Sequence, residues 1–211
     1  MNQPTVILAD DHALVAEALR RLLEPDFNVL ATANDGRTLV AEAVRLRPQV
    51  VVTDIAMPML NGLDAGAQLK TLCPEMKMVF LTQYRDSELV AEAFRRGGSG
   101  YMTKTAASSE LFTAIHEVLQ GRIYISQEIT NGVPGDLFHK KQSAGKNQLT
   151  IRQREVLQLL AEGCSMKKVA EILKITPRTV QFHKYRIMEL LNLETNAELV
   201  QYAMRQAIIA N

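Results

Sequence analysis

The first 120 residues alternate between short runs of β-branched and apolar residues and longer segments with apolar residues at helical spacing. The short runs are typical of strands buried on both faces, and the longer segments each have one apolar face. Five strands and five helices in strict alternation predict right-handed βαβ crossovers and a five-stranded, doubly wound parallel sheet, an α/β fold. The expected strands are 5–10, 28–33, 50–55, 78–83 and 100–104, and the expected helices are 13–24, 36–47, 62–72, 87–97 and 109–120.

Polar residues stand where the expected strands end. Asp10 and Asp11 close the first strand, and Asp54 closes the third. Thr82 closes the fourth strand, and Lys104 closes the fifth. In open parallel sheets, ligands bind in the crevice beyond the carboxyl ends of the strands. We therefore expect these five side chains to share one site.

The residue types at these positions suit phosphoryl transfer. Three carboxylates in one crevice repel one another unless a cation lies among them, and a few hard oxygen ligands are what Mg²⁺ prefers. Lys104 would add an ammonium group and Thr82 a hydroxyl. Asp54 ends the rigid run VVVTD and precedes a turn at Met57-Pro58, so it is the expected phosphoryl acceptor. The alternative is a set of polar strand ends with no shared function.

The C-terminal third differs in charge from the rest of the chain. The formal net charge of the 211 residues is +1. Residues 1–138 hold 12 basic and 17 acidic residues, whereas residues 139–211 hold 12 and 6. This split indicates a basic module that binds a polyanion, carried by an acidic domain. A solvated basic surface with no such partner is the alternative.

Residues after 121 change in character. The helical pattern breaks over 122–147, where Gly, Pro, Ser, Lys and Gln accumulate, and an interdomain linker is expected there. Helix signals resume with capping boxes at Thr150 and Thr195 and a Thr176-Pro177 start. Four helices are expected, at 151–163, 166–174, 177–191 and 196–209, the middle two forming a helix-turn-helix. The expected domains are therefore 1–121 and 148–211.

The third of these helices has two unlike faces. The inner face holds Val180, His183, Ile187 and Leu191 at helical spacing, which makes His183 a packing residue. The outer face holds Arg178, Gln181, Phe182, Tyr185 and Arg186. Such a face suits a DNA major groove, because arginines bind phosphates, glutamine pairs with an adenine edge and phenylalanine contacts a thymine methyl. A solvated helix with incidental aromatic residues is the alternative.

Residues 4–121 resemble the receiver domain of bacterial two-component response regulators. The matching pieces are the Asp10-Asp11 pair, VVTDIAMPMLNGL, the Leu81-Thr82 pair and GYMTK. The resemblance implies that a sensor histidine kinase phosphorylates Asp54. It also implies the site roles: Asp11, Asp54 and the Ala56 carbonyl as Mg²⁺ ligands, Asp10 acting through water or its own carboxylate, Thr82 and Lys104 binding phosphoryl oxygens, and Tyr101 as an aromatic switch.

One position departs from the receiver pattern, and two others lie where the family varies. Thr105 follows the lysine where many receivers have proline. Ala56 and Tyr84 flank the expected site, at positions that in the family tune the lifetime of the phosphorylated state.

The C-terminal residues resemble the LuxR-type helix-turn-helix that ends response regulators of the NarL/FixJ group. The matching pieces are LTIRQREVLQLLAEG, KKVAEIL, TPRTVQFH and IMELLNLETNAELVQYA. The resemblance implies that the third helix reads the major groove and that 196–208 forms a dimer contact. Gln181 and Tyr185 replace residues that are usually basic, and Met166 and Lys168 also depart. The expected DNA contacts are Lys167, Lys168, Arg178, Thr179, Gln181, Phe182, Lys184, Tyr185 and Arg186.

Together these features predict a transcription factor of the bacterial cytoplasm that forms a homodimer when phosphorylated. Its expected partners are a histidine kinase, promoter DNA and RNA polymerase. No apolar stretch is long enough to span a membrane, and Cys73 and Cys164 show no metal-ligand spacing. A turnover phosphatase is disfavoured, because Ala56 stands where such an enzyme needs an acid-base carboxylate. A phosphorylation-independent regulator whose helical module binds a protein remains an alternative.

Overall fold

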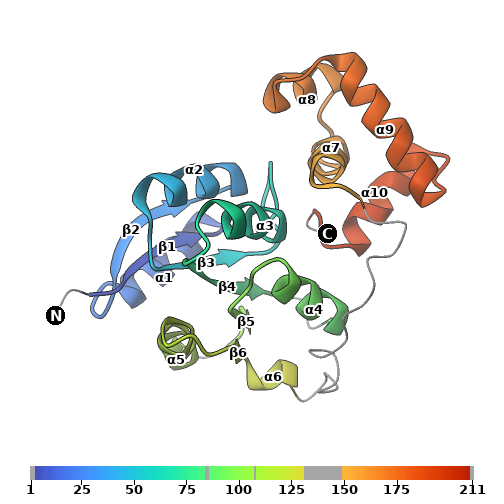
Figure 1. Ribbon diagram of the computed structural model, residues 1–211. Helices are drawn as coiled ribbons and strands as arrows, with labels where there is room; N and C mark the ends of the chain where they lie inside the picture. Colours follow the sequence, from blue (N-terminus) through green and yellow to red (C-terminus); the bar gives the residue numbers. More distant parts are fainter. Residues whose placement is uncertain (1–2, 84–85, 107, 131–148, 210–211) are drawn as a thin grey trace. The chain divides into compact units, whose positions relative to one another are not determined.

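The computed structural model describes residues 3–83, 86–106, 108–130 and 149–209 (Figure 1). The chain divides into two compact units, Met1–Lys140 and Lys141–Asn211, and each is considered by itself. Most of the expected linker, from residue 131 to residue 147, lies outside the described residues.

The first unit is built on a parallel sheet with the strand order β2-β1-β3-β4-β5-β6. All neighbouring strands pair in parallel, so each connection is a crossover. The strands are β1 (Thr5–Ala9), β2 (Asn28–Ala33), β3 (Val50–Asp54), β4 (Lys77–Thr82), β5 (Gly100–Thr103) and β6 (Tyr124–Ile125). This is the doubly wound order in which ligands bind beyond the carboxyl ends of the central strands.

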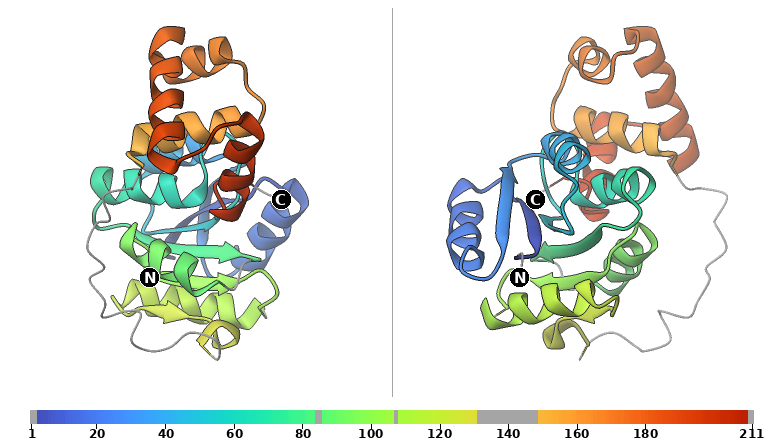
Figure 2. Two further views of the ribbon diagram at one scale, coloured as in Figure 1. Left: turned by 90° about the vertical axis from the view of Figure 1, so that its right-hand side faces the viewer. Right: turned by 60° about the vertical axis from the view of Figure 1, so that its left-hand side comes forward.

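Helices cover both faces of this sheet (Figures 1 and 2). They are α1 (Ala13–Leu23), α2 (Gly36–Leu46), α3 (Gly62–Leu72), α4 (Ser87–Arg95), α5 (Ser108–Leu119) and the single turn α6 (Gln127–Thr130). Leu23 of α1 and Ile115 of α5 pack in one apolar cluster with alternate residues of the strands, such as Val52 of β3. Because β3 is buried along its whole length, it holds its last residue, Asp54, in a fixed position.

The sixth strand corrects the expected count of five. Tyr124 and Ile125 pair in parallel with Gly100 and Tyr101 at the edge of the sheet. A strand of two residues is too short to show an alternating pattern, which is why the sequence gives no sign of it. Both β6 and α6 fall in the first part of the stretch expected to be linker, and the domain limits stay a proposal.

The start of α3 packs tightly against the peptide that follows β3. The N–H of Gly62 donates to the Ile55 carbonyl at 2.8 Å. A Cβ atom at position 62 would lie 2.0 Å from the backbone oxygen of Asp54. Asn61 caps the helix, because its side chain accepts from the Asp64 N–H. Glycine at position 62 therefore allows α3 to begin directly beside Asp54.

We expect Gly62→Ala to destabilise the first unit by about 3 kcal/mol, the upper end of the usual overpacking cost, because the added methyl group overlaps backbone that has no room to shift. Hydrogen exchange of the β3 amides would measure the loss. Gly121→Ala is the matched control: its φ is +78° but no atom lies within 4 Å of the new Cβ, so about 1 kcal/mol of backbone strain is expected. Equal losses in the two variants would contradict the proposed close packing.

The second unit consists of α7 (Ile151–Ala161), α8 (Met166–Leu173), α9 (Pro177–Leu191) and α10 (Asn196–Arg205). Both expected capping boxes form, at Thr150 with Gln153 and at Thr195 with Glu198. Thr176 caps α9, and proline occupies its first turn. Lys174 caps the C-terminal end of α8 with a φ of +53°, in the left-handed region, and so starts the turn to α9. This arrangement is the predicted helix-turn-helix.

Within the ranges that the structure describes, none of the helices combines the length and hydropathy needed to cross a membrane.

Candidate functional site

The polar residues singled out in the sequence lie at the carboxyl ends of neighbouring strands. Asp54 is the last residue of β3 and Thr82 the last of β4, and both are buried. Asp10 directly follows β1 and is 1% exposed. Lys104 directly follows β5, and its backbone N–H donates to the Thr82 carbonyl at 2.7 Å.

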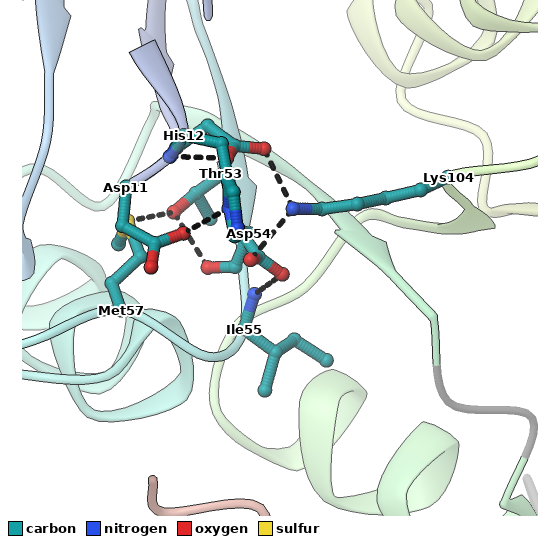
Figure 3. A network of polar contacts seen from close by, with 8 residues as sticks. Asp11, His12, Thr53, Asp54, Ile55, Met57 and Lys104 are labelled. Atoms are coloured by element: carbon teal, nitrogen blue, oxygen red, sulfur yellow. Dashed lines mark hydrogen bonds and ion pairs between the residues drawn. The ribbon is translucent and has the colours of Figure 1, made fainter. Parts of the chain in front are cut away.

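The Lys104 ammonium group joins two of the carboxylates (Figure 3). Its Nζ lies 2.7 Å from Asp10 Oδ2 and 2.8 Å from Asp54 Oδ2. The other Asp54 oxygen, Oδ1, accepts from the backbone N–H of Ile55 at 2.6 Å. Asp54 is thus held by one ammonium group and one peptide N–H at the carboxyl end of β3.

Burial and the ion pair together set the pKa values of Asp54 and Lys104. Burial raises the pKa of Asp54 and the nearby Asp10 charge raises it further, whereas the Lys104 ammonium opposes this rise. Burial alone would lower the pKa of Lys104, but its hydrogen bonds to Asp10 and Asp54 outweigh that effect and raise it. Lys104 therefore stays charged and stabilises negative charge between the two carboxylates.

The donor set suits a divalent cation. Ligand atoms of Asp10, Asp11 and His12 lie within 4.8 Å of one another. Lys104 pairs with Asp10 and Asp54, and Asp11 adds a third carboxylate beside Asp10, so the negative charge of these carboxylates exceeds the charge of the Lys104 ammonium and one Mg²⁺ would balance the difference. The side chain of Asp11 is 28% exposed, so it is the most accessible carboxylate of the three.

Sequence reasoning overlooked His12. Its Nδ1 lies 2.8 Å from Asp11 Oδ1 and 3.4 Å from Asp10 Oδ1, and its backbone N–H donates to Asp10 Oδ1 at 2.9 Å. Its place directly after two aspartates was the available signal, because residues just beyond the carboxyl end of a parallel strand border the region where ligands bind.

The remaining receiver positions are placed as follows. Tyr101 lies in β5 with 0% exposure, so its ring is inside the unit. Ala56, two residues after Asp54, is buried at 7% exposure. Tyr84, expected to flank the site, lies outside the described residues.

In the second unit, α9 presents aromatic rings to solvent. Phe182 and Tyr185 are 60% and 62% exposed. Arg178, Gln181 and Arg186 are also exposed. On the opposite side Val180 and Ile187 are fully buried, while His183 and Leu191 are half-buried. Burial lowers the pKa of His183, and the charge of Arg152 lowers it further, which favours a neutral packing role.

The basic residues around α9 differ in their surroundings. Lys168 pairs with Glu171 at 3.2 Å and Arg186 with Glu189 at 2.8 Å, so part of their charge is already neutralised. Lys167, like Arg178, is exposed.

Two of the residues expected to contact DNA, Thr179 and Lys184, are only partly exposed. Lys184 lines a cavity of about 250 Å³ beside Cys164 and Asn196. The Thr179 hydroxyl lies 2.9 Å from that of the helix cap, Thr176.

Comparison with known families decides what this arrangement is. Residues 6–116 match the response regulator receiver domain, and residues 147–203 match the luxR family of bacterial regulatory proteins. The chain is a response regulator. Its two domains, a receiver and a LuxR-type helix-turn-helix, are those of the NarL/FixJ group, and they make it a phosphorylatable, DNA-binding regulator of transcription.

Individual relatives agree with this assignment. The response regulator is 32% identical over 213 residues to the oxygen regulatory protein NreC of Staphylococcus haemolyticus, covering 97% of this chain and 98% of the relative. A two-component response regulator of the LuxR family from Aurantimonas sp. SI85-9A1 matches with a TM-score of 0.60 and 30% identity, over 63% of this chain and 96% of the other. RcsB in complex with DNA matches with a TM-score of 0.58 and 25% identity, over 95% and 98%.

Proposed function

We propose that Asp54 accepts a phosphoryl group from a sensor histidine kinase. The observation that carries this proposal is the Lys104 ammonium between Asp10 and Asp54. An Asp54 carboxylate oxygen attacks phosphorus, the bond between phosphorus and the donor breaks, and an acyl phosphate forms. Lys104 balances the charge that gathers on the phosphoryl oxygens.

Asp11, Asp54 and the Ala56 carbonyl are the proposed Mg²⁺ ligands, with Asp10 acting through water or directly. When bound, Mg²⁺ supplies charge neutralisation for the phosphoryl oxygens. The chain itself holds Asp54 through the Ile55 N–H and excludes bulk water by burying its carboxylate.

Thr82 and Tyr101 are the proposed switch residues. Thr82 ends β4 beside the end of β3 that carries Asp54, and its carbonyl accepts from the Lys104 N–H, so we place it among the residues that would bind a group on Asp54. Tyr101 of β5 pairs with Phe80 of β4, and Phe80 stands two residues before Thr82. Movement of Thr82 toward a phosphoryl group would thus be transmitted along β4 to the buried ring of Tyr101.

The helix-turn-helix is proposed to bind promoter DNA through the exposed side of α9. Arg178 of α9 and Lys167 of α8 would bind phosphates. Lys168 and Arg186 would also bind phosphates once they leave Glu171 and Glu189, their partners in the free protein. Gln181, Phe182 and Tyr185 would face base edges. Thr179 and Lys184 would add DNA contacts at the edge of this surface. A homodimer joined through α10 would place two such helices on neighbouring half-sites, with RNA polymerase as a further candidate partner.

The reaction is proposed as one phosphoryl transfer to the protein's own Asp54 rather than turnover of substrates. Ala56 offers no acid-base group beside Asp54 for rapid release.

Removal of the metal tests the acceptor site. We expect the full chain to take up a phosphoryl group from acetyl phosphate in Mg²⁺, and the rate to fall by about 100-fold or more with EDTA. The label should be released by hydroxylamine, as an acyl phosphate is, and intact-protein mass spectrometry would follow it. Uptake that is unaffected by EDTA would contradict the proposed metal ligands.

A further inference from the structure

Three side chains around the Lys104 backbone form a compact polar cluster. Thr103 and Thr105 stand on either side of Lys104, and Glu128 comes from α6. The Thr103 hydroxyl donates to Glu128 Oε2 at 3.1 Å. The Thr105 hydroxyl lies 3.1 Å from Thr103 Oγ1 and 3.3 Å from Glu128 Oε2, so its one proton can go to either oxygen. The cluster therefore ties both neighbours of Lys104 to one carboxylate.

The segment that carries Glu128 is itself fixed to β5. Strand β6 pairs with β5, and the Ser126 N–H donates to the Tyr101 carbonyl at 3.0 Å. Ile129, next to Glu128, is 1% exposed and anchors α6 in the core. Glu128 thus reaches the Lys104 turn from a rigid support rather than from a loose chain end.

The hydrogen bond from Thr103 to Glu128 matters because Thr103 is buried. Thr103 is 2% exposed, so loss of the Glu128 carboxylate would remove the hydrogen-bond acceptor of a hydroxyl at a largely buried position. Thr105 and Glu128 are themselves exposed, and a hydrogen bond between them alone would contribute little. The shared contact with a buried side chain makes the cluster a constraint on the backbone at the end of β5.

We propose that Glu128 and Thr105 are positioning residues for Lys104. This inference rests on the proposed role of Asp54 as phosphoryl acceptor. The Lys104 ammonium must lie between two carboxylates at 2.7 and 2.8 Å, and its long side chain has many rotamers. A fixed backbone reduces that freedom. Threonine at position 105 does not lock its own φ as proline would, and the bonds to Glu128 supply the restraint instead.

The test is the rate constant for phosphoryl uptake from acetyl phosphate with Mg²⁺, measured on the full chain. We expect Glu128→Ala to lower it about three- to tenfold and Thr105→Val about two- to fivefold. Glu128→Gln keeps an acceptor oxygen and should stay within about twofold of the wild type. Thr71→Val, which removes an exposed hydroxyl on α3, is the matched control and should have no effect.

A double-mutant cycle separates positioning from general structural damage. If Glu128 acts through Lys104, Glu128→Ala should have no further effect in a Lys104→Ala background. The same three- to tenfold loss in that background would overturn the inference, as would wild-type rates for Glu128→Ala alone. Absence of uptake by the wild-type protein would instead overturn the acceptor site itself, and the inference with it.

Discussion

Asp54→Asn is expected to abolish phosphoryl uptake from acetyl phosphate. The amide has nearly the shape of the carboxylate but no nucleophilic oxygen, so the acyl phosphate cannot form. The asparagine oxygen can still accept from one of the two donors that hold Asp54, the Lys104 ammonium or the Ile55 N–H, so the folded protein is expected to persist. Intact-protein mass spectrometry should show one added phosphoryl group in the wild type and none in the variant.

Asp26→Asn is the matched control, because Asp26 is an exposed aspartate of the same unit. It should take up the phosphoryl group at the wild-type rate. Persistent uptake by Asp54→Asn would assign the acceptor to another side chain, and peptide mapping of the labelled protein would identify it.

The second large effect is expected on DNA. Replacing both Gln181 and Phe182 with alanine should weaken binding to the preferred duplex by about 1–3 kcal/mol, with little change on unrelated duplexes. The reason is that these residues are proposed to contact base edges rather than phosphates. Arg178→Ala is the contrasting variant. It should weaken binding to all DNA sequences alike, and the slope of log affinity against log salt concentration should become shallower by about 1.

Replacement of thymine by uracil in the preferred duplex refines this test, since it removes only the C5-methyl group. Wild-type affinity should fall, and Phe182→Ala should be insensitive to the change. Equal affinity of the wild type for both duplexes would show that the exposed ring of Phe182 does not read a thymine methyl.

Much of the first unit was predictable because a buried parallel strand and an amphipathic helix have distinct periods. The ends of strands β1, β3, β4 and β5 fell within one residue of their predicted positions, and these ends place the two buried carboxylates as well as Thr82 and Lys104. What could not be predicted involves contacts between distant residues. Strand β6 has no period of its own, and the contact of Glu128 with Thr103 depends on the fold that brings α6 to β5.

The second unit shows the same division. Capping boxes at Thr150 and Thr195 are local, since each is made within four consecutive residues, and both form as the sequence indicates. The surroundings of Lys184 are not local. Its position beside Cys164 and Asn196 depends on how α9 packs against α10 and the turn before α8.

The most direct test of the central claim is a mobility-shift selection from a pool of random duplexes. The full chain is compared with and without acetyl phosphate and Mg²⁺, beside Asp54→Asn. We predict that the phosphodonor promotes selection of a two-fold-symmetric site and that the variant does not respond. Equal binding under all three conditions would contradict control by Asp54, and absence of binding in all of them would favour a protein partner for α9.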